Sequence, residues 1–417
     1  MDVGFLDFVN AMISWGWVAL PIFLFFVWKT LWMDYIRLKY RLSIEWIVLE
    51  IRLPQIVEKT PKVMEYILAG LYSIKSGSNI IEKYIDGKNQ LAISLEIASI
   101  NGAIHFFIRT PEGYKKLITS QILAQYPEAD IYEVDDYTLS LPQDIPNKEY
   151  DMWGTELLFT KEDAYPIRTY KNFKEEISLG EGSKGQFIDP ISSMMEILSQ
   201  LDNGEQMWIH YLIKPADDKW QKKGRGLINR ILGKEKKKLS NNVIEEIFYF
   251  FHDMVWVLFG KVPESKIKKD DSQEKDKRLS PGEKDTVEAI EESISKHGFH
   301  TNIRILYIAR RELFSEPNTR AIWGTFNQFS TFNLNGFKKN DRVTPGVDYF
   351  FVKTRDHLRK RKLYLNARNK IFKDRGMILN IEELATVYHI PSVIVETPSL
   401  PKVEHKKVNP PSSLPVI

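Results

Sequence analysis

The sequence has no cysteine among its 417 residues. This absence excludes disulfides, thiolate metal sites, iron–sulfur clusters and cysteine nucleophiles. The chain also lacks the GxxxxGK[ST] phosphate loop, the HExxH zinc motif and the GxSxG nucleophile turn. We therefore predict that the chain is not an enzyme and has no catalytic residue, no cofactor and no metal site.

A strong net charge is absent too. The formal net charge is only +3, so a surface for nucleic acid or for another acidic partner would have to be local. Hydrophobic residues make up 43% of the chain and charged residues 27%, which is typical of globular proteins and argues against wholesale disorder. The length is sufficient for two domains, each with its own core.

One long run, residues 8–28, carries no charged residue and has about the length needed to span a bilayer. Lys and Arg follow the run closely and none precedes it, which predicts an N-terminus outside and a C-terminal body in the cytoplasm. We therefore predict a single-pass protein of the cell (inner) membrane, against the alternatives of a cleaved signal peptide or a buried helix. The residues expected to anchor it in the bilayer are Trp15, Trp17, Pro21, Trp28 and Trp32.

The pattern in residues 43–150 predicts the order β-α-β-β-α-β, which is that of a ferredoxin-like (split βαβ) domain. Its strongest feature is Asn101-Gly102, a pair typical of a tight hairpin turn between two strands. The predicted elements are strands at 43–54, 90–100, 103–110 and 129–134, and helices starting at 60–61 and spanning 114–126.

Residues 151–397 repeat this theme and predict a second ferredoxin-like unit, with an insertion at about 214–284. The text IHYLIKP in its strand 205–215 is similar to IHFFIRTP in the first unit. The other predicted elements are strands at 151–160 and 301–310 and helices at 190–201, 283–297 and 311–329. The fold class is therefore α+β, with an anchor and juxtamembrane helix at 1–42, domains at 43–150 and 151–397, and a Pro-rich tail at 398–417.

Two basic segments are candidate contact surfaces for DNA or anionic lipid. Residues 353–375 hold ten Lys or Arg against two Asp, and residues 219–238 precede an aromatic stretch at 243–260. The alternatives are a solvated face for the first segment, and a buried or partner-binding helix for the second. The candidate residues are Lys222, Lys223, Arg225, Arg230, Arg359, Lys360, Arg361, Lys362, Arg368 and Lys370.

His105 and His210 occupy equivalent places in the two similar strands. We interpret them as half-buried sheet positions. A hydrolase would require the fold to bring both imidazoles and carboxylates into one cleft.

Several passages resemble the region that precedes the motor in conjugative-transfer, type IV secretion-type ATPases of the TraG/TraD and HerA-like kind. The passages are LEIRLPQIVEKTPKVME (49–65), IHFFIRTPEGYKKLITSQILAQYPEADIYEVDDY (104–137), ILNIEELATVYHIP (378–391) and VNPPSSLP (408–415). In such proteins a membrane anchor and a paired α+β region lead into the ATPase core.

The resemblance implies a membrane-anchored accessory half without a motor, since the phosphate loop is missing and no catalytic residue can be carried over. We expect a non-enzymatic scaffold that docks a separate DNA-translocation or secretion ATPase at the cytoplasmic face. The alternative is a membrane-tethered nucleic-acid-binding module that uses the basic face at 353–375. Self-association into a homo-oligomer is a further expectation.

Overall fold

The structure is a computed structural model that describes residues 3–52, 59–175, 186–234, 279–346, 348–374 and 376–391. Side chains are described for these residues except 3–19, 174–175 and 186–187. The predicted tail at 398–417, the aromatic stretch at 243–260 and Arg375 lie outside the described residues.

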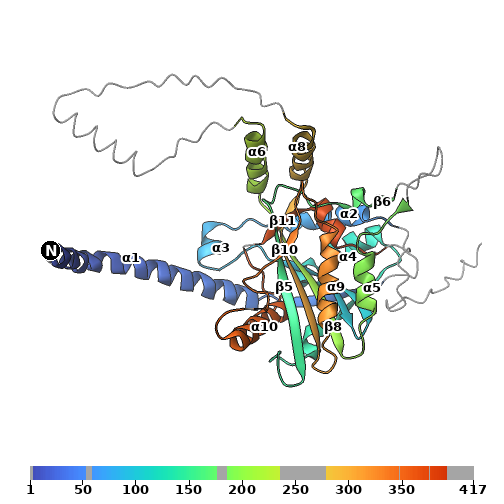
Figure 1. Cartoon of the computed structure of the whole chain (residues 1–417), viewed down its shortest axis with the longest axis horizontal. Helices are drawn as coiled ribbons and strands as arrows, with labels where there is room; N and C mark the ends of the chain where they lie inside the picture. Colours follow the sequence, from blue (N-terminus) through green and yellow to red (C-terminus); the bar gives the residue numbers. More distant parts are fainter. Residues whose placement is uncertain are drawn as a thin grey trace, which may run out of the picture.

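The body is built on one antiparallel sheet of nine strands, in the order β10-β5-β9-β8-β2-β3-β1-β4 with β11 also paired to β9 (Figure 1). A two-stranded sheet, β6-β7, lies apart from it. The strands are β1 (Trp46–Arg52), β2 (Ile93–Ile100), β3 (Ala103–Pro111), β4 (Asp130–Val134), β5 (Tyr150–Phe159), β6 (Lys174–Glu175), β7 (Gln186–Phe187), β8 (Glu205–Pro215), β9 (Gly298–Arg310), β10 (Phe337–Lys339) and β11 (Met377–Asn380).

The predicted hairpin is present at Asn101 and Gly102, which join β2 to β3 with backbone φ angles of 54° and 82°. Both are in the left-handed region that Asn and Gly tolerate best. On its other edge β2 pairs with β8, from Ile93 opposite Ile213 to Ile100 opposite Gln206. The prediction of two ferredoxin-like units is wrong, because this pairing merges the strands of both predicted units into one continuous sheet.

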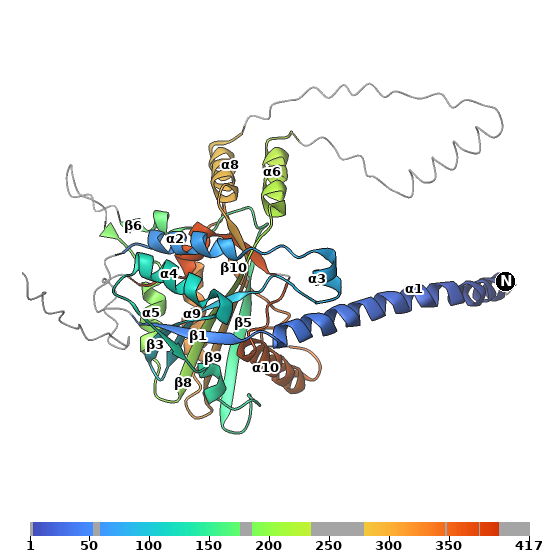
Figure 2. The same cartoon turned by 180° about the vertical axis from the view of Figure 1, so that it is seen from behind.

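Helices cover one face of the sheet and enclose the main core (Figures 1 and 2). Alternate strand residues such as Leu49, Leu95, Phe106, Ile209 and Ile305 are fully buried there, as period-two alternation requires. The covering helices are α2 (Lys62–Leu71), α4 (Lys115–Gln125), α5 (Ser192–Ser199), α9 (Glu316–Asn327) and α11 (Ile381–Val387). Short helices η1 (Tyr72–Ile74), α3 (Ile80–Tyr84), η2 (Glu112–Tyr114) and η4 (Tyr170–Asn172) connect them.

The opposite face is covered by α10 (Val352–Arg368) and by the segment that contains η3 (Tyr137–Ser140). The helix lies close to β5 at Gly154, where an added Cβ would meet a methyl group of Leu363 at 2.8 Å. Leu363 and Tyr364 pack there against Trp208 and Leu306 of the sheet. We call this side of the sheet the α10 face.

Two further helices, α6 (Lys219–Ile231) and α8 (Pro281–Ile294), stand side by side at one end of the sheet (Figures 1 and 2). Their contact buries Trp220, Leu227 and Ile290 in a separate small core. Ser280 caps α8, since its side chain accepts a hydrogen bond from the backbone N–H of Glu283. The helix α6 lies within the predicted insertion at about 214–284 and α8 begins near its end, while residues 235–278 lie outside the described residues.

The N-terminal helix α1 (Val3–Leu42) extends away from the body (Figure 1). No helix is long and apolar enough to cross a membrane among the residues that could be searched, which are those described above. Residues 20–37, the first part of α1 with described side chains, already include Lys29, Asp34 and Arg37. The prediction of a single transmembrane helix, and with it that of an inner-membrane protein with its N-terminus outside, is therefore wrong.

The residues predicted to anchor the chain lie along α1. Pro21 is inside the helix, and the indoles of Trp28 and Trp32 stack with ring centroids 6.1 Å apart. The indole N–H of Trp32 donates a hydrogen bond to the carbonyl of Tyr84 at 3.0 Å, which ties α1 to the end of α3. The side chains of Trp15 and Trp17 lie outside the described part of the chain.

Candidate functional site

A row of ionisable side chains crosses the α10 face perpendicular to the strands. Register places Glu96 of β2 opposite His210 of β8, His210 opposite Arg304 of β9, and Arg304 opposite Glu156 of β5. All four are buried. Because residues directly opposite each other on one face of a sheet are close neighbours, the row forms a continuous polar layer under α10.

Arg304 is the best-bonded member of this row. Its guanidinium is fully buried, contacts one carboxylate oxygen of Glu156 at 2.9 Å, and donates to the carbonyls of Asn366 and Ile371 at 2.9 and 3.1 Å. Lys373 donates to the other oxygen of Glu156 at 2.7 Å. The sheet is thereby bonded to the end of α10 and to the loop that follows it.

His210 is held as a neutral imidazole. The hydroxyl of Tyr137 lies 2.7 Å from Nε2 of His210 and 2.7 Å from the carboxylate of Glu96. Since the hydroxyl donates to the carboxylate, Nε2 carries the proton and donates to the hydroxyl oxygen. Burial lowers the pKa of His210 to about 4, against the opposing attraction of Glu96.

The two histidines do not share an open cleft. His105 pairs with Glu50 at 2.6 Å on the same face, but the rings of Phe107 and Tyr137 stack between it and His210. His210 has no exposed surface. His105 is half-buried as the sequence pattern predicts, whereas His210 is fully buried, and the two imidazoles with their carboxylates do not share one cleft.

A basic cavity lies where the last turns of α1 meet the sheet, and we call it the α1 pocket. Its volume is about 320 Å³. The lining side chains come from α1, from β1, β3 and β8, and from the loops before β2 and β11. They are Asp34, Arg37, Leu38, Arg41, Trp46, Asn89, Gln90, Leu91, Ala92, Arg109, Lys214, Asn369, Lys370, Phe372 and Asp374.

Four of the predicted basic residues of α10 and its following loop bind the body itself. Arg359 donates to the carbonyls of Asp341 and Thr344, and Lys360 pairs with Asp151 at 2.7 Å. Arg368 donates to the carbonyls of Thr138 and Leu141, and Lys370 is buried against Asp136 at 2.6 Å. Only Arg361 and Lys362 of the predicted set on this segment are exposed.

An exposed apolar surface at the start of α10 was not recognised in the sequence. Phe350 and Phe351 are 84% and 81% exposed, and Tyr349, Val352 and Leu358 are exposed beside them. We call these five residues the aromatic patch. Phe350 and Phe351 have φ angles of 41° and 52°, a left-handed backbone that such residues rarely adopt and that is concentrated at functional sites. The signal available in the sequence was the run Tyr-Phe-Phe-Val at the head of a basic segment.

The second predicted basic segment forms α6. Lys222, Lys223, Arg225 and Arg230 are all exposed on this helix, and Arg230 pairs with Glu162 at 3.1 Å. The helix packs against α8 through its buried face, and its association with lipid or a partner stays a prediction.

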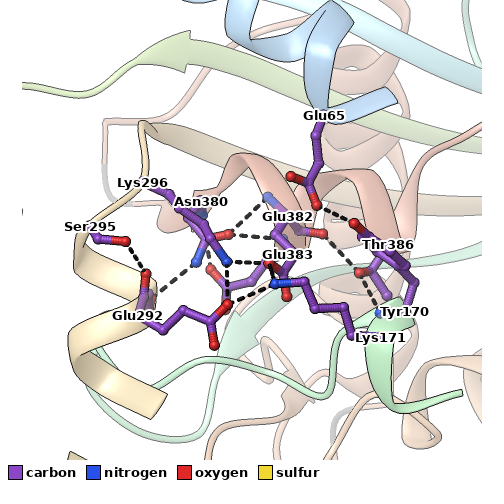
Figure 3. Close-up of polar contacts among 11 residues, drawn as sticks. Glu65, Tyr170, Lys171, Glu292, Ser295, Lys296, Asn380, Glu382, Glu383 and Thr386 are labelled. Carbon is purple, nitrogen blue, oxygen red and sulfur yellow. Dashed lines mark hydrogen bonds and ion pairs between the residues drawn. The ribbon is translucent and has the colours of Figure 1, made fainter. Parts of the chain in front are cut away.

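A closed polar network fixes the start of α11 (Figure 3). The side chain of Asn380 accepts hydrogen bonds from the backbone N–H groups of Glu382 and Glu383 at 2.9 Å each. The carboxylate of Glu383 accepts the backbone N–H groups of Asn380 and Ile167, also at 2.9 Å. Burial raises the pKa of Glu383 to about 8.

Two lysines complete this network (Figure 3). Lys171 and Lys296 each bind both Glu382 and Glu292. Hydrogen bonds from these lysines lower the pKa of Glu292 to about 2. Each of these four side chains is paired with side chains of opposite charge. The network therefore holds residues 378–391 against the body.

Comparison with known proteins adds one match. Residues 38–402 match the model of a family described as Domain of unknown function (DUF8128). No curated protein matches the chain. The family match spans the base of α1, the whole described sheet and the helices on both of its faces. The chain therefore belongs to the DUF8128 family.

Proposed function

We propose that this protein is a non-enzymatic docking scaffold for a separate DNA-translocation or secretion ATPase, and that the aromatic patch is the docking surface. The observation that carries the proposal is the exposure of Tyr349, Phe350 and Phe351 together on one turn of backbone. Contiguous exposed apolar side chains are typical of interaction sites, and aromatic residues dominate binding energy in interfaces.

Hydrogen bonds hold the backbone that carries the patch in place. Arg355 donates to the carbonyl of Tyr349 at 2.8 Å, and the carboxylate of Asp356 accepts the backbone N–H of Gly346 at 3.0 Å. At the far end of α10, the hydroxyl of Tyr364 donates to the carbonyl of Pro142 at 2.7 Å. A surface already held in one conformation loses little conformational entropy on binding, which favours its use as a docking site.

The charge around the patch selects the kind of partner. Lys353, Arg355, His357, Arg361 and Lys362 are exposed along α10, the helix that begins at the patch. A partner surface with an apolar centre and an acidic rim would complement it. The choice of an ATPase of the TraG/TraD or HerA-like kind is supported by the similarity of residues 49–65, 104–137 and 378–391 to the region that precedes such motors.

Four basic residues of the segment 353–375 bond to the protein itself. This weakens the alternative that the segment binds the phosphate backbone of nucleic acid. Arg359, Lys360, Arg368 and Lys370 are committed to the body. The remaining cations with exposed aromatics could still stack and hold a single strand. Binding of nucleic acid is therefore a competing outcome of the test.

The test is binding of the full chain to a purified ATPase of this kind from the same genome, measured by calorimetry. We expect Phe350→Ser combined with Phe351→Ser to weaken binding by about ten-fold or more, since each buried Phe side chain contributes about 1.5–3 kcal/mol. The matched control is Phe332→Ser, which removes another fully exposed Phe from a different surface and should change nothing.

Three results would contradict the proposal. The ATPase does not bind the wild-type chain, or it binds the double variant equally well, or the double variant instead loses affinity for a single-stranded oligonucleotide in a salt series. The last result would establish the nucleic-acid alternative. If the mass of the wild-type chain rises with concentration and that of the double variant does not, the patch binds a second copy of this chain instead.

A further inference from the structure

The α1 pocket combines a small-molecule size with an excess of positive charge. Its volume of about 320 Å³ is within the range of small-ligand sites. Five of its lining residues are Lys or Arg and two are Asp. These cations come from α1, β3, β8 and the loop after α10, so tertiary folding alone brings them together.

Two of the five cations are already neutralised. Lys214 pairs with Asp374 at 2.5 Å. Lys370 donates to both carboxylate oxygens of Asp136 and to the hydroxyl of Thr138, which uses all three of its N–H groups.

The other three cations are Arg37, Arg41 and Arg109. Their guanidinium groups have no hydrogen bond or ion pair with any residue that the structure describes. Arg109 is only partly exposed, and its guanidinium lies over the ring of Trp46 at 4.2 Å. Stacking occupies the faces of a guanidinium and leaves its N–H groups free to donate in the plane.

Electrostatics in the pocket favour an incoming anion. Burial lowers the pKa of Arg109, and the positive charge of Arg41 lowers it further, while Glu96 and Asp136 oppose both effects. Two like charges in a partly desolvated site repel each other, and an anion placed between them would relieve that repulsion. Arginine pairs match the geometry of phosphate oxygens through bidentate hydrogen bonds.

We propose that the α1 pocket binds the phosphate group of a small molecule of about mononucleotide size, with Arg37, Arg41 and Arg109 as the phosphate ligands. Asn89, Asn369 and Phe372 line the remaining space and would contact the rest of the molecule. Because Arg37 and Arg41 belong to α1 and Arg109 to β3, a bound phosphate would also bridge the helix to the sheet. This site is separate from the aromatic patch and does not depend on the proposed ATPase.

The experiment is a titration of the full chain with inorganic phosphate and with adenosine monophosphate at low and physiological salt, read by calorimetry and by thermal unfolding. We expect both to bind and the nucleotide to bind more tightly. Arg109→Gln and Arg41→Gln should each weaken binding by about ten-fold or more, as expected for loss of a charged hydrogen bond. Lys39→Gln, on the same helix but not in the lining, is the matched control.

Equal binding by wild type and Arg41→Gln would overturn the proposal, and so would the absence of binding by both probes at millimolar concentration. Arg41 is at the edge of the body, so its substitution tests the site even if Arg109→Gln fails to fold. Binding of a single-stranded oligonucleotide with no response to adenosine monophosphate would also overturn it, because the phosphate would then belong to a polymer.

Discussion

Arg304→Gln tests whether the buried polar layer holds α10 on the sheet. The guanidinium has no exposed surface and makes four hydrogen bonds, two to Glu156 and one each to the carbonyls of Asn366 and Ile371. A glutamine is shorter and uncharged, so it cannot reach all of these acceptors. The substitution leaves Glu156 with Lys373 as its ion-pair partner and leaves buried carbonyls without donors.

The magnitude follows from these losses. Breaking a buried ion pair by removing one partner costs about 3–5 kcal/mol. Because Lys373 stays 2.7 Å from Glu156, the loss should fall at the low end of this range. We expect the free energy of unfolding to drop by about 3 kcal/mol and the melting temperature by roughly 3–4 °C, since the entropy of unfolding scales with the length of 417 residues.

The assay is urea denaturation followed by circular dichroism, with thermal unfolding as a second measure. The control is Arg320→Gln, which removes an exposed ion pair with Glu316 and should cost about 0.5 kcal/mol or less. A change below about 1 kcal/mol for Arg304→Gln would refute the reasoning, since the buried pair would then behave like a surface pair.

Two further predictions concern Glu383 and Gly87. Burial raises the pKa of Glu383 from 4.5 to about 8, so between these values the folded chain binds more protons than the unfolded chain and stability should fall as pH rises. Glu383→Gln should flatten this slope, at most about 1.4 kcal/mol per pH unit, in denaturation series at pH 5 to 8; an unchanged slope would contradict it. A Cβ at Gly87 would lie 2.3 Å from the carbonyl oxygen of Ile36 at a φ of +70°, so Gly87→Ala should destabilise the seating of α1 by about 1–3 kcal/mol. Gly77→Ala, where nothing lies within 4 Å, is the control in thermal unfolding, and equal melting temperatures for the two variants would disprove the contact.

Local sequence patterns predicted most of the secondary structure. The strand predicted at 205–215 coincides with β8, and the helices predicted at 190–201 and 283–297 contain α5 and nearly all of α8. Asn101-Gly102 marked its hairpin correctly because the turn geometry depends on those two residues alone. Apolar periodicity and turn chemistry are short-range properties, so the sequence displays them directly.

The membrane prediction failed because it rested on one uncharged run without its tertiary contacts. The described part of α1 carries charges and buries Met33 and Ile36 against the body. Whether an apolar segment meets lipid or protein depends on what the rest of the chain brings to it.

The sequence by itself determined many of the strands and helices, such as β8, α5 and the β2–β3 hairpin, because these depend on residues a few positions apart. Only the tertiary structure decided that β2 and β8 join two predicted units into one sheet, since that pairing links residues more than a hundred positions apart. It also decided which arginines and lysines are neutralised and which face a pocket, because the partners of a charge are chosen by distance in space. Arg109 and Lys370 are both ordinary basic residues in the sequence, and folding stacks one on an aromatic ring and buries the other against the carboxylate of Asp136.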